Sequence, residues 1–260
     1  MATYNKRGYK TPKEKEEKLE TTNVQEEIID DKDSTTAGVF SKLDEGANKA
    51  EAFVERNQKY IFGLVAVIAL VTVGYMLYNK YISEPKEDKA ANEMFQAQQY
   101  FKQAVDAPKG DSLFKLALNG EKGKLGFIKL ADEYSGTDAG NLCNYYAGIS
   151  LLNTAKYADA IKYLEKFSSK DMMLQSLATG AIGDANSELN KTKEALEFYI
   201  KASETNKNDL TTPRFLFKAG QTAMALNQKS DALKYFTEIK EKYETSPEAS
   251  QIDGYIGMAQ

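Results

Sequence analysis

The stretch AKYADAIKYL, residues 155–164, is one of three similar stretches in the C-terminal half of the chain. Within it, Ala160 lies twelve residues after Gly148 and four residues before Leu164. The same order of glycine, alanine and bulky residue occurs twice more, as Gly183, Ala195 and Tyr199 and then as Gly220, Ala232 and Phe236. Because the glycines are 35 and 37 residues apart, the sequence predicts a structural repeat of about this length.

Helix packing gives this register a physical reason. A small residue on a first helix and another early on a second let the two backbones approach, and a bulky residue one turn later fills the groove beside them. One helix pair cannot cover its own apolar face, so neighbouring pairs must stack. Sustained alternation of apolar and polar residues, which would indicate strands, is absent. The sequence therefore predicts an all-α solenoid with clear units at about 141–174, 176–209 and 213–246.

At these positions the chain resembles the tetratricopeptide repeat. That family has a small residue on its first helix, Ala early on its second and an aromatic residue or Leu one turn later, and residues 155–164 are similar to the opening of its second helix. The chain departs from the family in lacking its Trp, in place of which stand Asn144, Thr179 and Leu216. The resemblance implies a right-handed solenoid that binds proteins on a concave inner wall.

Helices are also expected before the clear units, at 92–105, 113–118 and 125–134. Residues 134–139 (YSGTDA) are similar to residues 243–249 (YETSPEA) in the third unit, which indicates that a degenerate repeat comes first. The repeat domain is therefore expected to span 88–260. Before it, the polar run at 83–88 contains Pro85 and is expected to break the helix.

The uncharged run at residues 61–78, IFGLVAVIALVTVGYMLY, is the strongest single signal. About twenty helical residues span about 30 Å, which is the hydrocarbon thickness of a bilayer. Lys59 and Lys80 bracket the run, and tyrosines lie near both of its ends, as in membrane helices. The sequence predicts a transmembrane helix at 60–82. A buried helix of a soluble protein is the alternative.

Two segments precede this run. Residues 1–38 are rich in charged residues and Thr and are expected to form a disordered cytoplasmic tail. The cluster of Lys6, Arg7 and Lys10 could touch anionic lipid or a ribosome, with a solvated tail as the alternative. Residues 39–58 have a narrow apolar stripe, which predicts a juxtamembrane amphipathic helix or an extension of the next helix.

Residues that carry chemistry are scarce. The chain has no His, the commonest general base and metal ligand. Its single Cys143 excludes an intramolecular disulfide and is expected to be a buried apolar side chain rather than a reactive thiol. It has neither a Walker loop nor a dinucleotide fingerprint, and a net charge of −4 does not indicate nucleic-acid binding. The sequence predicts a protein that is not an enzyme and has no cofactor, metal, nucleic acid or small-molecule substrate.

The layout of one signal-anchor helix followed by a repeat domain is similar to that of the YfgM-like family of ancillary subunits of the bacterial SecYEG translocon. The resemblance covers about residues 50–258 and includes the lead-in ERNQK at 55–59, whereas the long charged tail departs from it. It implies a single-pass protein of the bacterial inner membrane, with a cytoplasmic N-terminus and a periplasmic repeat domain. It further implies binding of SecYEG, periplasmic chaperones or unfolded clients.

A scaffold subunit of an envelope machine, for secretion, division or outer-membrane assembly, is the alternative function. In either case the first helix of each unit is expected to line the concave wall. The predicted protein-binding positions are Tyr145, Ile149 and Leu152 in the first unit, Asp184 and Glu188 in the second, and Arg214, Phe217, Gln221 and Met224 in the third. This mixed groove suits an extended or helical peptide, with packing against the neighbouring unit as the alternative for each position.

The apolar run is expected to remain on the mature protein. It follows a long leader, and no small-x-small cleavage site comes after Tyr78, so a signal peptidase has no substrate there. Intact-mass spectrometry of the protein purified from its membranes should therefore find a chain that still contains the run. A mature chain that begins after residue 75 would contradict this expectation.

Overall fold

The computed structural model describes residues 35–260, which form helices and turns with no strand among them. The chain divides into two compact units, Met1–Ala69 and Leu70–Gln260. The expected tail lies outside the described residues up to position 34, as does its basic cluster Lys6, Arg7 and Lys10. From Thr35 the remainder of the tail belongs to the first helix.

Helix α1 spans Thr35–Tyr78 and holds both the expected juxtamembrane helix and most of the apolar run. Helix α1 is continuous from residues 39–58 into the apolar run. This favours the alternative in which residues 39–58 are an extension of the membrane helix rather than a separate amphipathic helix. The large apolar side chains from Phe62 to Tyr78 are each more than half exposed. By length and composition, the helical stretch Glu45–Asp106 contains a window that could cross a membrane, and none of that window is buried.

The expected break at residues 83–88 is wrong. A π-helical stretch, η2 (Asn79–Ser83), joins α1 to α2 (Glu84–Asp106) without interruption. The backbone N–H of Glu84 donates to the carbonyl of Asn79, five residues back. Pro85 lies in the first turn of α2. Because the helix is continuous here, Pro85 removes one backbone donor from its interior, which weakens the helix without ending it.

The helices expected ahead of the clear units are confirmed as α2, α3 (Asp111–Asn119) and α4 (Phe127–Glu133). They share one cluster of buried apolar side chains with the next helix, and this cluster includes Met94, Phe127 and Cys143. The first buried side chain of α2 is Ala90. The packed core of this unit therefore begins one to two helical turns after the π-helical stretch.

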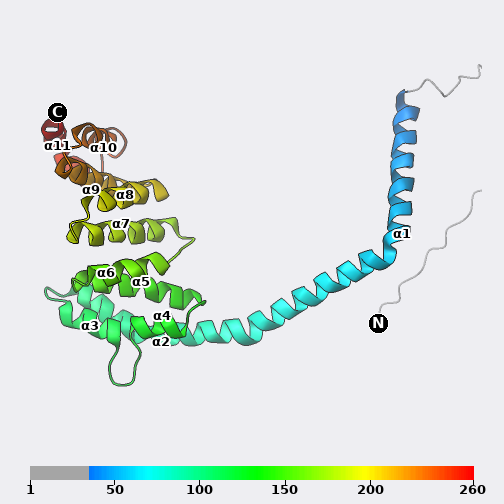
Figure 1. Ribbon diagram of the computed structural model, residues 1–260, viewed down its shortest axis with the longest axis horizontal. Helices are drawn as coiled ribbons and strands as arrows, with labels where there is room; N and C mark the ends of the chain where they lie inside the picture. The colour runs from blue at the N-terminus through cyan, green and yellow to red at the C-terminus, as the bar shows by residue number, and fades with distance from the viewer. Residues whose placement is uncertain (1–34) are drawn as a thin grey trace, which may run out of the picture. The chain divides into compact units, whose positions relative to one another are not determined.

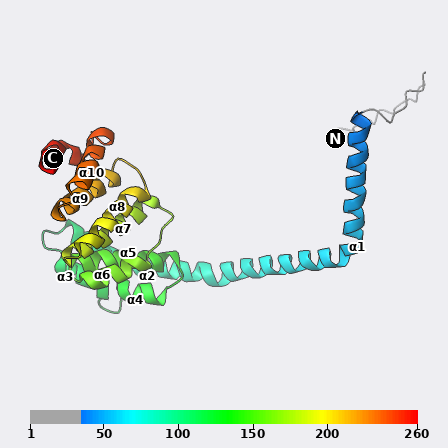
Figure 2. The same ribbon diagram turned by 45° about the horizontal axis from the view of Figure 1, so that its top comes forward.

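Three helix pairs and a short terminal helix follow. The pairs are α5 (Asp138–Asn153) with α6 (Tyr157–Lys166), α7 (Met172–Glu188) with α8 (Thr192–Thr205), and α9 (Thr211–Ala225) with α10 (Lys229–Lys242). A 3-10 turn, η3 (Pro247–Gln251), leads into α11 (Ile252–Ala259). Both views show the helices stacked in chain order, from α2–α4 at one end to α11 at the other (Figures 1 and 2). The prediction of an all-α repeat fold is confirmed.

The recurring glycines lie between the paired helices. A Cβ atom added to Gly148 would collide with the side chain of Leu164, which lies on the partner helix. The same holds for Gly183 against Tyr199 and for Gly220 against Phe236. The alanines of the pattern, Ala160, Ala195 and Ala232, are completely buried. Close approach of the two backbones, with a bulky side chain filling the groove, is therefore the packing rule of all three pairs.

The turns inside the pairs repeat as well. Ala155, Asn190 and Asn227 each have a positive φ of 58–59° and follow the first helix of their pair. The next residue in each turn donates its N–H to a carbonyl five positions back, from Lys156 to Leu151 in the first pair. This left-handed ending satisfies the last carbonyls of the first helix and reverses the chain in a few residues. Short, uniform turns keep each pair antiparallel.

Replacing Gly183 by Leu should overpack the middle pair, because even a Cβ atom would meet the Tyr199 ring. We expect a loss of about 1–3 kcal/mol in the free energy of unfolding. Since repeats stabilise their neighbours, the loss should extend to the flanking pairs. Urea unfolding followed by circular dichroism measures it. Glu194→Ala is the matched control, because Glu194 is an exposed residue of α8. Equal midpoints for Gly183→Leu and the parent would contradict the repeat register.

Candidate protein-binding surface

The nine predicted wall positions all lie on the first helices of the three pairs, α5, α7 and α9. None of them is fully buried: Glu188, Arg214 and Gln221 are exposed, and the other six are half-buried. α7 packs against both α5 and α9. Successive first helices therefore form one side of the stack, and the side chains that they present differ from one end to the other.

The α5 part of this surface is apolar. Tyr145, Ile149 and Leu152 pack against a buried cluster that includes Leu164 and Phe167. The ring centroids of Tyr145 and Phe167 are 5.3 Å apart. These three side chains therefore contribute to packing between units and expose only part of their surface.

Burial raises the pKa of the Tyr145 phenol, and the charge of Arg214 opposes that rise. Arg214 belongs to α9 and is exposed. The charge of one predicted wall position therefore influences another that is far apart in the sequence.

A hollow of about 700 Å³ lies next to this apolar part, between the end of α5, α7 and α9. It brings together four of the nine predicted positions, Leu152, Asp184, Glu188 and Gln221. The rest of its lining is mainly polar and includes Ser187, Asn190, Thr192 and Thr222. The hollow is thus the place where the predicted wall is open and rich in hydrogen-bonding groups.

Asp184 is the centre of a small polar network in the hollow. Its carboxylate accepts a hydrogen bond from the Tyr199 hydroxyl at 2.8 Å and forms an ion pair with Lys218. The Lys218 ammonium lies 5.5 Å from the centroid of the Tyr199 ring. Burial raises the pKa of Tyr199, and the Asp184 carboxylate adds to the rise. The side chains of Asp184 and Lys218 are each 28% exposed, so a partner could still reach both.

The sequence prediction missed Tyr199 and Lys218. Lys218 lies 34 residues after Asp184, three fewer than the 37 that separate Gly183 from Gly220, so the ion pair joins successive first helices at positions about one helical turn out of register. A search for opposite charges one full repeat apart would therefore have missed this pair. Tyr199 was recognised as the bulky packing residue, and only the structure shows that its hydroxyl also reaches the hollow.

The α9 part of the surface is covered by α11. The ring centroids of Phe217 and Tyr255 are 4.8 Å apart, and Gln221 donates a hydrogen bond to the Tyr255 hydroxyl at 3.3 Å. Met224 packs against a further buried cluster, which includes Leu216 and Phe236. For Phe217 and Met224, packing against a neighbouring helix accounts for at least part of the buried surface.

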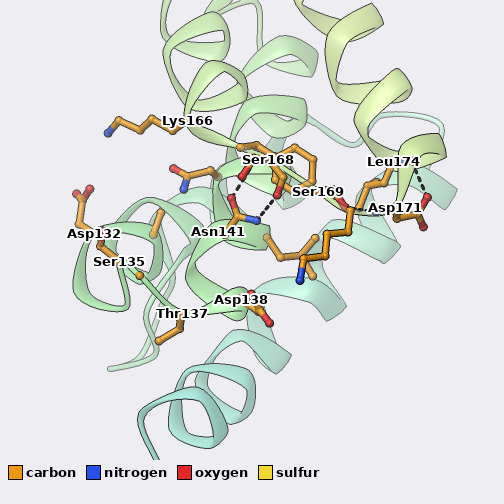
Figure 3. A pocket seen from close by; sticks show the side chains of 16 residues that line it. Asp132, Ser135, Thr137, Asp138, Asn141, Lys166, Ser168, Ser169, Asp171 and Leu174 are labelled. Atoms are coloured by element: carbon orange, nitrogen blue, oxygen red, sulfur yellow. Dashed lines mark hydrogen bonds between the residues drawn. The ribbon is translucent and has the colours of Figure 1, made fainter. Parts of the chain in front are cut away.

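A second and larger cleft, of about 1090 Å³, lies outside the predicted wall (Figure 3). It is bounded by the α4–α5 turn, the first half of α5 and the loop between α6 and α7. Asn141 donates to the carbonyl of Ser168 at 2.6 Å and accepts from its N–H at 3.1 Å, which fixes that loop to α5. The lining mixes acidic and basic side chains, among them Asp132, Asp138 and Lys166, so no single charge dominates.

A family model of the tetratricopeptide repeat matches residues 215–246, the span of α9 and α10. The chain carries a tetratricopeptide repeat. The match coincides with the third predicted unit, 213–246, and the two pairs before it show the same glycine packing and the same turn. No curated protein matches the chain. Tetratricopeptide repeats typically bind other proteins, so the match suggests a protein-interaction module.

Cys143 belongs to the core of this repeat protein rather than to either hollow. Its side chain is 1% exposed and packs in the first buried cluster, as expected from the sequence. Burial raises the pKa of the thiol to about 12. A thiol reacts as its thiolate, so burial lowers the reactivity of this cysteine at neutral pH.

At pH 8, about one Cys143 thiol in 10,000 should be ionised, given a pKa of about 12. The folded protein should therefore fail to react with an aromatic disulfide reagent over minutes, and urea should release one thiol per chain. Asn153→Cys is the matched control, because Asn153 is exposed at the end of the same helix and should give one fast-reacting thiol without urea. Fast labelling of the folded parent would contradict the burial.

Proposed function

We propose that the protein is a non-enzymatic binding module anchored in the bacterial inner membrane by one transmembrane helix. The N-terminus lies in the cytoplasm and the repeat domain in the periplasm. There it binds translocating or periplasmic client proteins, or their chaperones, near the Sec translocon. The tetratricopeptide match supports binding of proteins, and the layout of the chain supports the rest of the proposal.

The anchor is supported by the exposed apolar surface of α1. Apolar side chains from Phe62 to Tyr78 surround the helix, and the helical window that contains them has a mean hydropathy of 2.3. Soluble monomers rarely expose contiguous apolar surface on this scale. Lipid would cover it on all sides. Lys59 and Lys80 would then lie at the two interfaces, where their charged groups reach water.

The hollow between α5, α7 and α9 is the single observation that carries the binding proposal. It is open, it holds four predicted wall positions, and its lining offers both donors and acceptors. Lys218 uses one ammonium proton on Asp184 and keeps others, and the Asp184 carboxylate has acceptor sites beyond the two in use. A peptide backbone presents donors and acceptors in alternation. An extended segment of a client therefore matches this lining, with the apolar side chains of α5 beside it.

The cleft in Figure 3 favours the alternative function, a scaffold subunit of an envelope machine. A scaffold needs more than one binding surface, and the cleft shares no lining residue with the hollow. The two functions differ in the number of partners. A client-binding module contacts many proteins weakly, whereas a scaffold contacts one partner in a fixed ratio at each of its surfaces.

A photo-crosslinking amino acid placed at Gln221, in the hollow, tests both functions in intact membranes. The control carries the same amino acid at Glu194, which is exposed on the second helix of the middle pair. We expect crosslinked protein at position 221 to exceed that at position 194 by at least about fivefold, since binding energy concentrates in buried contact sites. Equal crosslinking at the two positions would reject the hollow as the binding surface.

The pattern of products separates the two functions. A ladder of many products from position 221 supports client binding, and recovery of Sec translocon subunits among them supports the proposed location. A single stoichiometric product supports the scaffold. If the protein is recovered from the soluble fraction after alkaline carbonate treatment, the proposed membrane anchor is wrong.

A further inference from the structure

The first turn of α5 is capped by a residue from a distant part of the chain. The Glu87 carboxylate of α2 accepts hydrogen bonds from the backbone N–H groups of Asp138, at 2.6 Å, and Ala139, at 2.7 Å. Thr137 accepts the N–H of Gly140 at 2.9 Å. All the N–H groups at the start of α5 are thereby satisfied, and a negative charge lies at the positive end of the helix dipole.

The other two first helices are capped locally. The N–H groups of Met173 and Leu174, in the first turn of α7, donate to the carboxylate of Asp171, directly before that helix. At α9, the side chain of Asn208 accepts the N–H groups of Leu210 and Thr211. Only α5, among the first helices of the three pairs, takes its cap from a residue about fifty positions earlier. Glu87 therefore caps the N-terminus of α5 and also connects α2 to α5.

Two further contacts join the same elements. The Lys86 ammonium donates to the carbonyl of Ser135 at 3.1 Å, and the Lys89 ammonium lies 5.9 Å from the centroid of the Tyr134 ring. We refer to the contacts of Glu87 with Asp138 and Ala139, together with these two, as the Glu87 clamp. It ties the start of α2 to the turn between α4 and α5.

The helix that the clamp holds is intrinsically weak. Residues 79–83 are π-helical, and Pro85 follows without an N–H to donate. No side chain is buried from Asn79 to Asp88, and the first buried one is Ala90. This part of the helix gains no stability from packing, and both the π turn and the proline weaken it. Contacts from outside the stretch must therefore keep it helical.

We propose that the Glu87 clamp is a conformational device that keeps residues 79–88 helical and attached to the first repeat, and that its opening turns this stretch into a hinge. Closed, the clamp makes η2 and α2 one continuous helix packed on the repeats. Open, the repeats are free to reorient relative to the chain that precedes residue 79. The device does not depend on which partner the hollow binds.

Hydrogen–deuterium exchange of the full-length chain in detergent tests the proposal. Glu87→Ala removes both acceptor oxygens. We expect the amides of residues 138–139 and those of 79–84 and 86–88 to exchange about tenfold faster. This is the increase expected when a hydrogen bond to a charged group is lost. Asp88→Ala, which changes an exposed neighbouring carboxylate, should exchange like the parent. Glu87→Gln, which keeps one acceptor oxygen, should give a smaller rise at the same positions.

Three outcomes would overturn the proposal. Faster exchange confined to residues 138–139 would mean that Glu87 is only a cap of α5. An unchanged pattern would mean that the clamp contributes nothing. Faster exchange throughout α8 and α10 as well would mean that Glu87 supports overall stability rather than a local hinge.

Discussion

The contact between a glycine on one helix and a bulky side chain on its partner is the constraint on which the rest of the repeat domain depends. Gly148, Gly183 and Gly220 let the paired backbones approach until Leu164, Tyr199 and Phe236 fill the grooves beside them. Glycine weakens a helix by about 0.5–1 kcal/mol relative to alanine, so each of these positions carries a local cost that close packing must offset. That packing sets the distance between the two helices of each pair, and the pairs are the units that stack.

The repeat fold could be predicted because its determinants are local and periodic. Glycine, alanine and bulky residue recur in register, and each contact spans only sixteen residues of sequence. The apolar run was equally clear as a helix. The error at residues 83–88 came from reading Pro85 as a helix breaker, whereas the helix continues through it. A proline in a helix removes one backbone donor and weakens the helix, but contacts from other elements decide whether the helix ends there.

The binding surface was only partly predictable, because its polar contacts join residues from different elements. Asp184 was placed on the wall by register, but its partners Tyr199 and Lys218 were not. Phe217 was placed there too, although α11 covers much of it through Tyr255. The role of Glu87 could not be predicted from any local pattern, because the helix that it caps begins about fifty residues later in the sequence. Contacts of this kind depend on the fold being formed first.

The ion pair between Asp184 and Lys218 has a mechanical consequence. It links α7 to α9, so a force that spreads these helices must separate two opposite charges. Because both groups are partly exposed, dissolved salt screens their attraction. The stiffness of the solenoid at the hollow therefore depends on ionic strength. At low salt the ion pair resists separation of α7 and α9, and at high salt these helices separate more easily when a partner binds between them.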